Sequence, residues 1–251
     1  PDVLFWVGCA GSFDDRAKRI TKAIARILHA SETSFAVLGQ EESCTGDPAK
    51  RAGNEFLYQM QAAQNIATLN GYEIKRIITG CPHCFNVLKN EYPELGGNYE
   101  VLHHTQFIRE LIETGKLRMA DGAPFRGKRI TFHDPCYLGR GNGEYLAPRE
   151  IIQKLDAELL EMRRCKQNAM CCGAGGAQMF KEAENGNAEV NHERTNEALE
   201  NKPEVIATGC PFCNTMITDG VKNANQESEV EVKDIAELIA EAADLLDPSA
   251  S

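Results

Sequence analysis

Short apolar runs alternate with longer amphipathic segments along the whole chain. The apolar runs predict buried strands at residues 3–7, 35–38, 74–79, 99–102, 129–133, 158–162, 204–208 and 229–232. Apolar positions at helical spacing predict helices at residues 16–29, 53–69, 82–90, 105–114, 148–155, 191–200, from 211 onward, and at 234–246, where Asp234 is the expected N-cap. Alternation of strands and helices predicts an α/β fold with mostly parallel sheets.

The same order of elements occurs twice. Residues 115–127 include three glycines and Pro124, and this segment is the natural link between the two halves. We therefore expect two pseudo-symmetric lobes, residues 1–118 and 119–251, each a small, mostly parallel sheet flanked by helices. In such sheets, functional sites form beyond the carboxyl ends of the strands.

The cysteines repeat with the same period as the elements. Nine of the ten fall into two sets, and corresponding members are 127 to 129 residues apart. The first set is Cys9, Cys44, Cys81 and Cys84, and the second is Cys136, Cys171, Cys172, Cys210 and Cys213. Each set ends in a Cys-Pro-x-Cys motif that lies between a predicted strand and a predicted helix. The N-terminus of a helix stabilises thiolates, because its free N–H groups and dipole favour negative charge.

Three kinds of chemistry compete for these cysteines. The five thiolates of the second set are one more than a tetrahedral zinc ion or a cubane cluster needs, and they favour an iron–sulfur centre. The four of the first set also match a closed structural zinc site. Either Cys-Pro-x-Cys motif alone would suit dithiol redox chemistry. Cys165 lies outside both sets and is expected to be a free, structural thiol.

Composition excludes several classes of partner. The net charge is −10, and no Lys/Arg stripe occurs, which argues against nucleic acid and against an anionic membrane surface. The longest apolar runs are far shorter than the ~20 residues that span a bilayer, so no transmembrane segment is expected. A cysteine-rich acidic chain without a visible secretory signal is expected in the cytoplasm, where thiols stay reduced.

Three stretches of the second half carry a family resemblance. They are His-Asp-Pro-Cys-Tyr-Leu-Gly-Arg at residues 133–140, Cys-Cys-Gly-Ala-Gly-Gly at 171–176 and Cys-Pro-Phe-Cys at 210–213. With them the chain resembles the duplicated cysteine-rich (CCG) domain family, which includes the catalytic B subunit of heterodisulfide reductase. The resemblance covers essentially the whole chain.

The resemblance implies an oxidoreductase subunit with a non-cubane [4Fe–4S] cluster. The cluster ligands would be Cys136, Cys171, Cys172, Cys210 and Cys213. Such a cluster serves electron transfer or the reduction of a disulfide or a quinone, with electrons from a partner subunit that carries cubane clusters or flavin. A membrane-associated partner would bring the chain to the membrane surface. The alternatives are a subunit of lactate or glycolate oxidation and, in another class, a zinc-bound structural protein.

The first motif departs from the family pattern. It reads Ser43-Cys44-Thr45-Gly46, and we interpret Ser43 as the replacement of a missing thiolate. A hydroxyl is a much poorer ligand for soft metals. Cys9, Cys44, Cys81 and Cys84 would then hold a second [4Fe–4S] cluster or zinc.

Two histidines lie next to the cysteine motifs. His83 is inside the first Cys-Pro-x-Cys motif, and His133 precedes Cys136 by three residues. We expect each of these histidines to donate a proton to a bound disulfide or quinone, or to ligate the metal directly. His103 and His104, which follow a predicted strand, are further candidates for the same roles.

Overall fold

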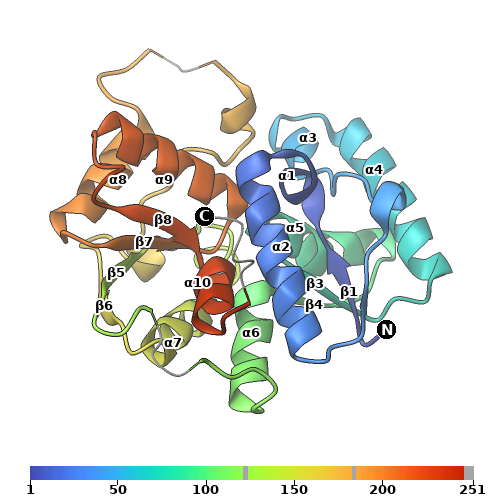
Figure 1. Ribbon diagram of the computed structural model, residues 1–251. Helices are drawn as coiled ribbons and strands as arrows, with labels where there is room; N and C mark the ends of the chain where they lie inside the picture. Colours follow the sequence, from blue (N-terminus) through green and yellow to red (C-terminus); the bar gives the residue numbers. More distant parts are fainter. Residues whose placement is uncertain (121–123, 183–184, 246–251) are drawn as a thin grey trace.

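The computed structural model describes residues 1–120, 124–182 and 185–245 and consists of two α/β lobes that lie side by side (Figure 1). Each lobe contains a four-stranded sheet in which every strand pair is parallel. The first sheet has the order β2-β1-β3-β4, with β1 Val3–Trp6, β2 Phe35–Ala36, β3 Arg76–Thr79 and β4 Glu100–His103. The second has the order β6-β5-β7-β8, with β5 Arg129–Phe132, β6 Glu158–Leu160, β7 Val205–Thr208 and β8 Glu231–Asp234.

The predicted fold class is confirmed, because the second sheet repeats the strand order of the first. The boundary at residues 118 and 119 stays a prediction. Part of the proposed link, residues 121–123, lies outside the described residues.

Every predicted helix is present, with shifted ends. The helices are α1 Gly8–Phe13, α2 Asp15–Ala30, α3 Asp47–Arg51, α4 Glu55–Gly71, α5 Pro82–Asn86, α6 His104–Glu113, α7 Leu146–Lys154, α8 Val190–Glu200, α9 Pro211–Asn223 and α10 Ile235–Ala242. The sequence analysis missed α1 and α3, which are too short to show a helical period. Asp234 is the N-cap of α10, as predicted, and accepts a hydrogen bond from Ala236 N. The predicted end of that helix, Leu246, lies outside the described residues.

Helix α2 shows how the apolar pattern places an element. Asp14 caps it by accepting a hydrogen bond from Ala17 N at 2.7 Å. Its apolar positions form one buried stripe: Ile20, Ala23, Ile24, Ile27 and Leu28. That stripe faces the opposite lobe and packs against α10.

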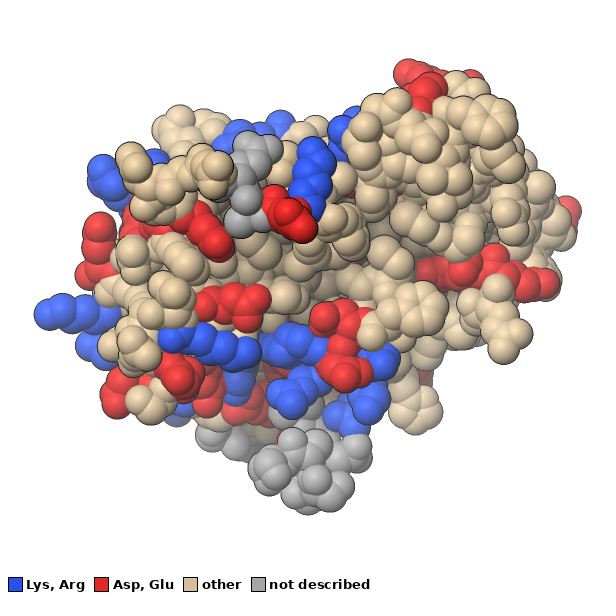
Figure 2. Space-filling model, turned by 90° about the horizontal axis from the view of Figure 1, so that it is seen from above, with Lys and Arg blue, Asp and Glu red and all other residues tan. Residues whose placement is uncertain are grey.

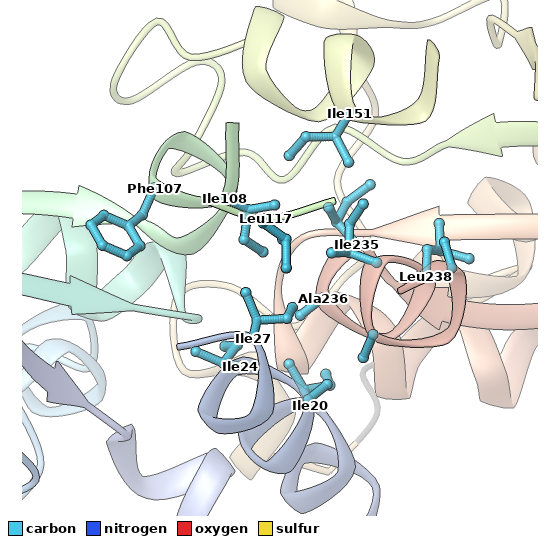
Figure 3. Close-up of a cluster of buried hydrophobic side chains, with 14 of the residues drawn as sticks. Ile20, Ile24, Ile27, Phe107, Ile108, Leu117, Ile151, Ile235, Ala236 and Leu238 are labelled. Atoms are coloured by element: carbon cyan, nitrogen blue, oxygen red, sulfur yellow. The ribbon is translucent and has the colours of Figure 1, made fainter. Parts of the chain in front are cut away.

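Four helices form a layer between the two sheets. Helix α2 contacts α10, and α6 contacts α7. These pairings follow the pseudo-two-fold relation, since α2 and α7 follow the first strand of each lobe, and α6 and α10 follow the last. One apolar cluster runs through this layer and reaches the inner faces of both sheets (Figure 3). Separate cores cover the outer faces, beneath α4 and α5 in the first lobe and beneath α8 and α9 in the second.

Polar contacts also cross the boundary between the lobes. Arg16 donates two hydrogen bonds to the Glu237 carboxylate, at 2.7 and 2.8 Å. His104 Nε2 is 2.9 Å from Asp234 Oδ1, and both side chains are buried. His103 is the N-cap of α6, in the place that Asp234 has at α10. His103 and His104 therefore serve the helix start and the lobe boundary.

The charge of the surface and the length and apolar character of the helices are relevant to the expected partners. On the face seen in Figure 2, Lys and Arg side chains are interspersed with Asp and Glu over the left and centre, and the right part is mostly uncharged with some Asp and Glu. Among the described helices, none has the length and apolar character needed to cross a membrane. The expectation that nucleic acid is not a partner stays a prediction.

The shared apolar layer predicts that the lobes unfold together. Trp6 is the sole tryptophan and reports on the first lobe. Ile239, on α10 of the second lobe, is fully buried in the shared cluster. Ile239→Ala should destabilise the protein by about 2–5 kcal/mol and lower the urea midpoint of Trp6 fluorescence. The exposed control Val190→Ala should leave it unchanged. If Ile239→Ala left the urea midpoint of Trp6 fluorescence unchanged, the lobes would fold independently.

Candidate metal centre

Both Cys-Pro-x-Cys motifs start helices at the carboxyl ends of central strands. Cys81 follows β3 as the N-cap of α5, and Cys210 follows β7 as the N-cap of α9. The next residue in each motif is proline, whose fixed φ suits the first helical position. The predicted placement of both motifs is therefore confirmed.

The two motifs meet at the lobe boundary. The thiols of Cys81 and Cys210 are hydrogen-bonded to each other, although they belong to different lobes. Cys81 also bonds to Cys84, and Cys210 to Cys213. The sequence predicts two related sites, and the structure joins them into one contiguous region of sulfur atoms.

The structure brings all five cysteines of the second set together. Hydrogen bonds between neighbouring thiols form one chain in the order Cys136, Cys171, Cys172, Cys213, Cys210. Gly173, which has a φ of +95°, donates its N–H to Cys171 Sγ at 3.3 Å. Neighbouring thiols and the glycine amides hold the pKa of Cys171 well below its ordinary value. The centre of the set is thus built for a thiolate.

The first set is also assembled. The thiols of Cys9 and Cys44 are hydrogen-bonded, and Cys84 interacts electrostatically with both. The hydrogen bond from Cys9, followed by one from Gly46 N, lowers the pKa of Cys44 to about 7. Gly46 has a φ of +91° and donates its N–H to Cys44 Sγ at 3.5 Å.

These contacts correct the interpretation of the first motif. The Gly46 amide bonds to Cys44 as the Gly173 amide bonds to Cys171, so Cys44-Thr45-Gly46 corresponds to Cys171-Cys172-Gly173. Thr45 is buried, and its hydroxyl donates a hydrogen bond to Cys84 Sγ at 3.9 Å. In the second lobe, Cys172 makes the equivalent contact with Cys213.

Ser43 has a different partner. Its hydroxyl donates to Asn65 Oδ1 at 2.9 Å. The prediction that Ser43 replaces the missing thiolate is therefore wrong, and Thr45 stands at that position. The signal was present in the sequence, because a constant offset of 127 residues relates Cys9 to Cys136, Cys44 to Cys171 and Gly46 to Gly173.

His83 lies where the two sets meet. Its Nδ1 is 2.9 Å from Asp47 Oδ2, and its ring centroid is 4.3 Å from that of Tyr137 in the second lobe. Burial opposes the charged imidazole, but Asp47 and the Cys81 thiolate outweigh it and raise the pKa of His83. Asp47, itself bound by Arg51 Nε at 3.0 Å, is a site residue that the sequence analysis did not single out.

His133 lies inside the second set. One of its ring nitrogens is within 4.8 Å of the Cys172 and Cys213 sulfur atoms. Arg194 Nε donates a hydrogen bond to His133 Nδ1 at 3.0 Å. Burial and, next, the Arg194 charge lower the pKa of His133 to about 3, so the ring is neutral. The sequence analysis missed Arg194, because nothing in its helical pattern marks a buried arginine.

A buried ion pair supports the loop that carries Cys136. Asp134 accepts two hydrogen bonds from Arg149, each at 2.8 Å, and a third from Lys166 N at 2.7 Å. Arg140 donates to the carbonyl of Ala169, close to the adjacent cysteine pair. These bonds tie three separate segments around the second set.

The donor set fits an iron–sulfur group. Five thiols from three segments form one connected chain, and a glycine amide bonds to Cys171 within it. His133 Nε2 is buried without a hydrogen-bond partner among the described residues, which suits a polar group bound at this point. Cys165 stands apart and donates to Glu161.

Comparison with known proteins agrees with this geometry. The EtfAB:quinone oxidoreductase of Syntrophomonas wolfei is 44% identical over 247 residues, covering 96% of this chain and 34% of the relative. The probable iron-sulfur-binding oxidoreductase FadF of Bacillus subtilis is 45% identical over 242 residues, covering 96% and 34%. One subunit of the dihydromethanophenazine:CoB–CoM heterodisulfide reductase of Methanosarcina barkeri is 33% identical over 248 residues, covering 96% and 59%. The chain thus spans about a third of the length of the first two relatives.

The family model for the cysteine-rich domain (CCG) matches the chain twice, over residues 3–89 and 130–218. The first match contains the whole first set of cysteines, and the second contains the whole second set. The chain therefore belongs to the cysteine-rich (CCG) domain family and carries two copies of the domain.

Proposed function

We propose that this chain is the iron–sulfur part of a heterodisulfide-reductase-like redox complex that passes electrons to a quinone. The observation that carries the proposal is the connected chain of five thiols at the lobe boundary. The likeness to a relative named EtfAB:quinone oxidoreductase supports quinone as the acceptor. The donor would be a partner subunit with cubane clusters or flavin, at the membrane surface where that partner is membrane-bound.

The second set would hold a non-cubane [4Fe–4S] cluster through Cys136, Cys171, Cys172, Cys210 and Cys213. When bound, such a group supplies one-electron transfer. Five convergent thiols exceed the four that a structural zinc takes, and this excess favours the redox function over a zinc scaffold. The first set offers the four thiolates that a cubane cluster or a zinc ion takes, and metal analysis decides between the two.

The Cys81–Cys210 contact would connect the two centres. Each cysteine belongs to one of the two sets, and their sulfur atoms are neighbours. We infer that electrons pass between the lobes by this contact when both sets hold clusters.

His83 would donate a hydrogen bond to the substrate. Its ring lies between the two sets and packs against Tyr137 and Phe212 of the second lobe. Asp47 occupies Nδ1 and thereby orients the ring, which leaves Nε2 to donate a hydrogen bond to the oxygen or sulfur that gains charge on reduction.

A disulfide is the second candidate substrate. The 33% identity to a relative named as part of a heterodisulfide reductase favours it. The proposed hydrogen bond from His83 would then go to the leaving sulfur of the disulfide in place of a quinone oxygen.

Metal analysis tests the second centre. Anaerobically purified protein should contain several irons with acid-labile sulfide, and Cys172→Ser should remove the EPR signal of the second centre, since oxygen is a poor ligand for this group. Cys165→Ser, outside both sets, is the matched control and should retain iron and signal. Zinc without iron in the wild-type protein would refute the proposed redox function.

Thr45 is expected to decide the chemistry of the first centre. Thr45→Cys restores a fifth thiol at the position equivalent to Cys172, and it should add a second signal resembling that of the second centre. Thr45→Val removes the hydroxyl at nearly constant volume and should leave the spectrum unchanged. Identical spectra of the two variants would show that a fifth thiol here is not sufficient.

Reduction of an added acceptor tests His83. Loss of one preorganised hydrogen-bond donor should slow oxidation of the dithionite-reduced holoprotein by a water-soluble quinone by about 10²-fold in His83→Leu. Asp47→Asn should give a smaller loss, and iron content should match wild type in both. Unchanged rates at full iron content would exclude His83 from the reaction, and a faster reaction with a disulfide than with a quinone would favour the second candidate.

A further inference from the structure

The fully buried Arg194 is the starting point. It lies on α8 with none of its side chain exposed, and arginine is rarely buried without a specific role. Its Nε donates to His133 Nδ1 at 3.0 Å, and its Nη1 donates to the Arg164 carbonyl at 2.9 Å. Glu197, 3.4 Å away, balances its charge. The guanidinium is therefore held from two sides and directed at an imidazole.

This hydrogen bond determines the tautomer of His133. A guanidinium has five N–H donors and no acceptor, so the bonded Nδ1 must supply a lone pair. The imidazole is then neutral and carries its single proton on Nε2. A neutral ring with this proton has no lone pair left for a metal ion.

The remaining Nε2–H is the free donor of a ring that lies beside the second set of cysteines. A ring nitrogen of His133 lies within 4.8 Å of the Cys172 and Cys213 sulfur atoms, and Arg194 already occupies Nδ1. Nε2 is buried and has no partner within residues 1–120, 124–182 and 185–245. A buried donor without a partner is costly, so a sulfur acceptor at this point would satisfy it.

The first lobe contains an equivalent donor. In the first sheet, Trp6 at the end of β1 pairs with Thr79 of β3. In the second sheet, Phe132 at the end of β5 pairs with Ala207 of β7, so the next residue, His133, lies beside Thr208. Thr79 and Thr208 occupy the same place before the two Cys-Pro-x-Cys motifs, so Trp6 corresponds to His133. The indole N–H of Trp6 is likewise buried without a partner among the described atoms, in the same apolar cluster as Cys81 and Cys84.

We propose that Arg194 is a positioning residue that keeps His133 in the Nε2–H tautomer, so that His133 donates a hydrogen bond to sulfur of the second centre and does not ligate metal. An indole can only donate, and Arg194 makes the imidazole in the other lobe behave in the same way. The inference rests on the proposed cluster in the second set. Because hydrogen bonds to sulfur tune the reduction potential of such centres, we expect this one to raise the potential by stabilising the more negative, reduced state.

Spectroelectrochemical titration of the anaerobic holoprotein tests the inference. His133→Leu removes the donor and should make reduction of the second centre about tenfold less favourable, which is about 59 mV for one electron. His133→Gln places an amide N–H near the position of Nε2 and should restore most of the potential. The matched control His29→Leu, on the exposed end of α2 in the other lobe, should change nothing.

Pulsed EPR separates a donor from a ligand. In wild-type protein with ¹⁵N-histidine, the second centre should show weak nitrogen coupling. It should also show coupling to one exchangeable deuteron, and this coupling should be absent from His133→Leu. Strong ¹⁵N coupling would overturn the inference, because it would make His133 a ligand. An unchanged potential in His133→Leu at full iron content would also overturn it, while leaving the proposed function intact. Absence of iron from the wild-type protein would instead refute the proposed function.

Discussion

The apolar layer between the lobes is the constraint on which the site depends. Helices α2, α6, α7 and α10 each bury one face against a helix of the other lobe, and one cluster of side chains joins the two sheets. Such packing is dense and permits little sliding. It therefore fixes the carboxyl ends of β3 and β7 relative to each other, and the Cys81–Cys210 contact follows.

Within this symmetric frame the two lobes have diverged in chemistry. Thr45 occupies the place of Cys172, so the first lobe has four convergent thiols where the second has five. The ring donors differ as well, with the indole of Trp6 in one lobe and the imidazole of His133 in the other. An imidazole can present either nitrogen as donor or acceptor, and the buried Arg194 removes that ambiguity. We interpret the second lobe as the one adapted for redox chemistry.

Local patterns were sufficient to predict much of the fold. The apolar stripe of α2 and the N-cap Asp234 depend on neighbours in sequence, and both are confirmed. The helix starts after Cys81 and Cys210 were predictable for the same reason, because proline at the first helical position acts locally. Helices α1 and α3 were missed, since five or six residues carry too little periodicity. The Ser43 assignment was wrong because side-chain direction, rather than adjacency to Cys44, decides which residue meets Cys84.

The sequence by itself determined the two sets of cysteines, their repeated spacing and their positions after strands, because these follow from residue identity and local periodicity. Only the tertiary structure decided that the sets touch, that the Thr45 hydroxyl meets Cys84, and that His83 bonds to Asp47 while His133 bonds to Arg194. His133 and Arg194 are 61 residues apart in the chain. Their contact arises from the packing of α8 on the second sheet, and contacts of this range leave no periodic trace in a single sequence.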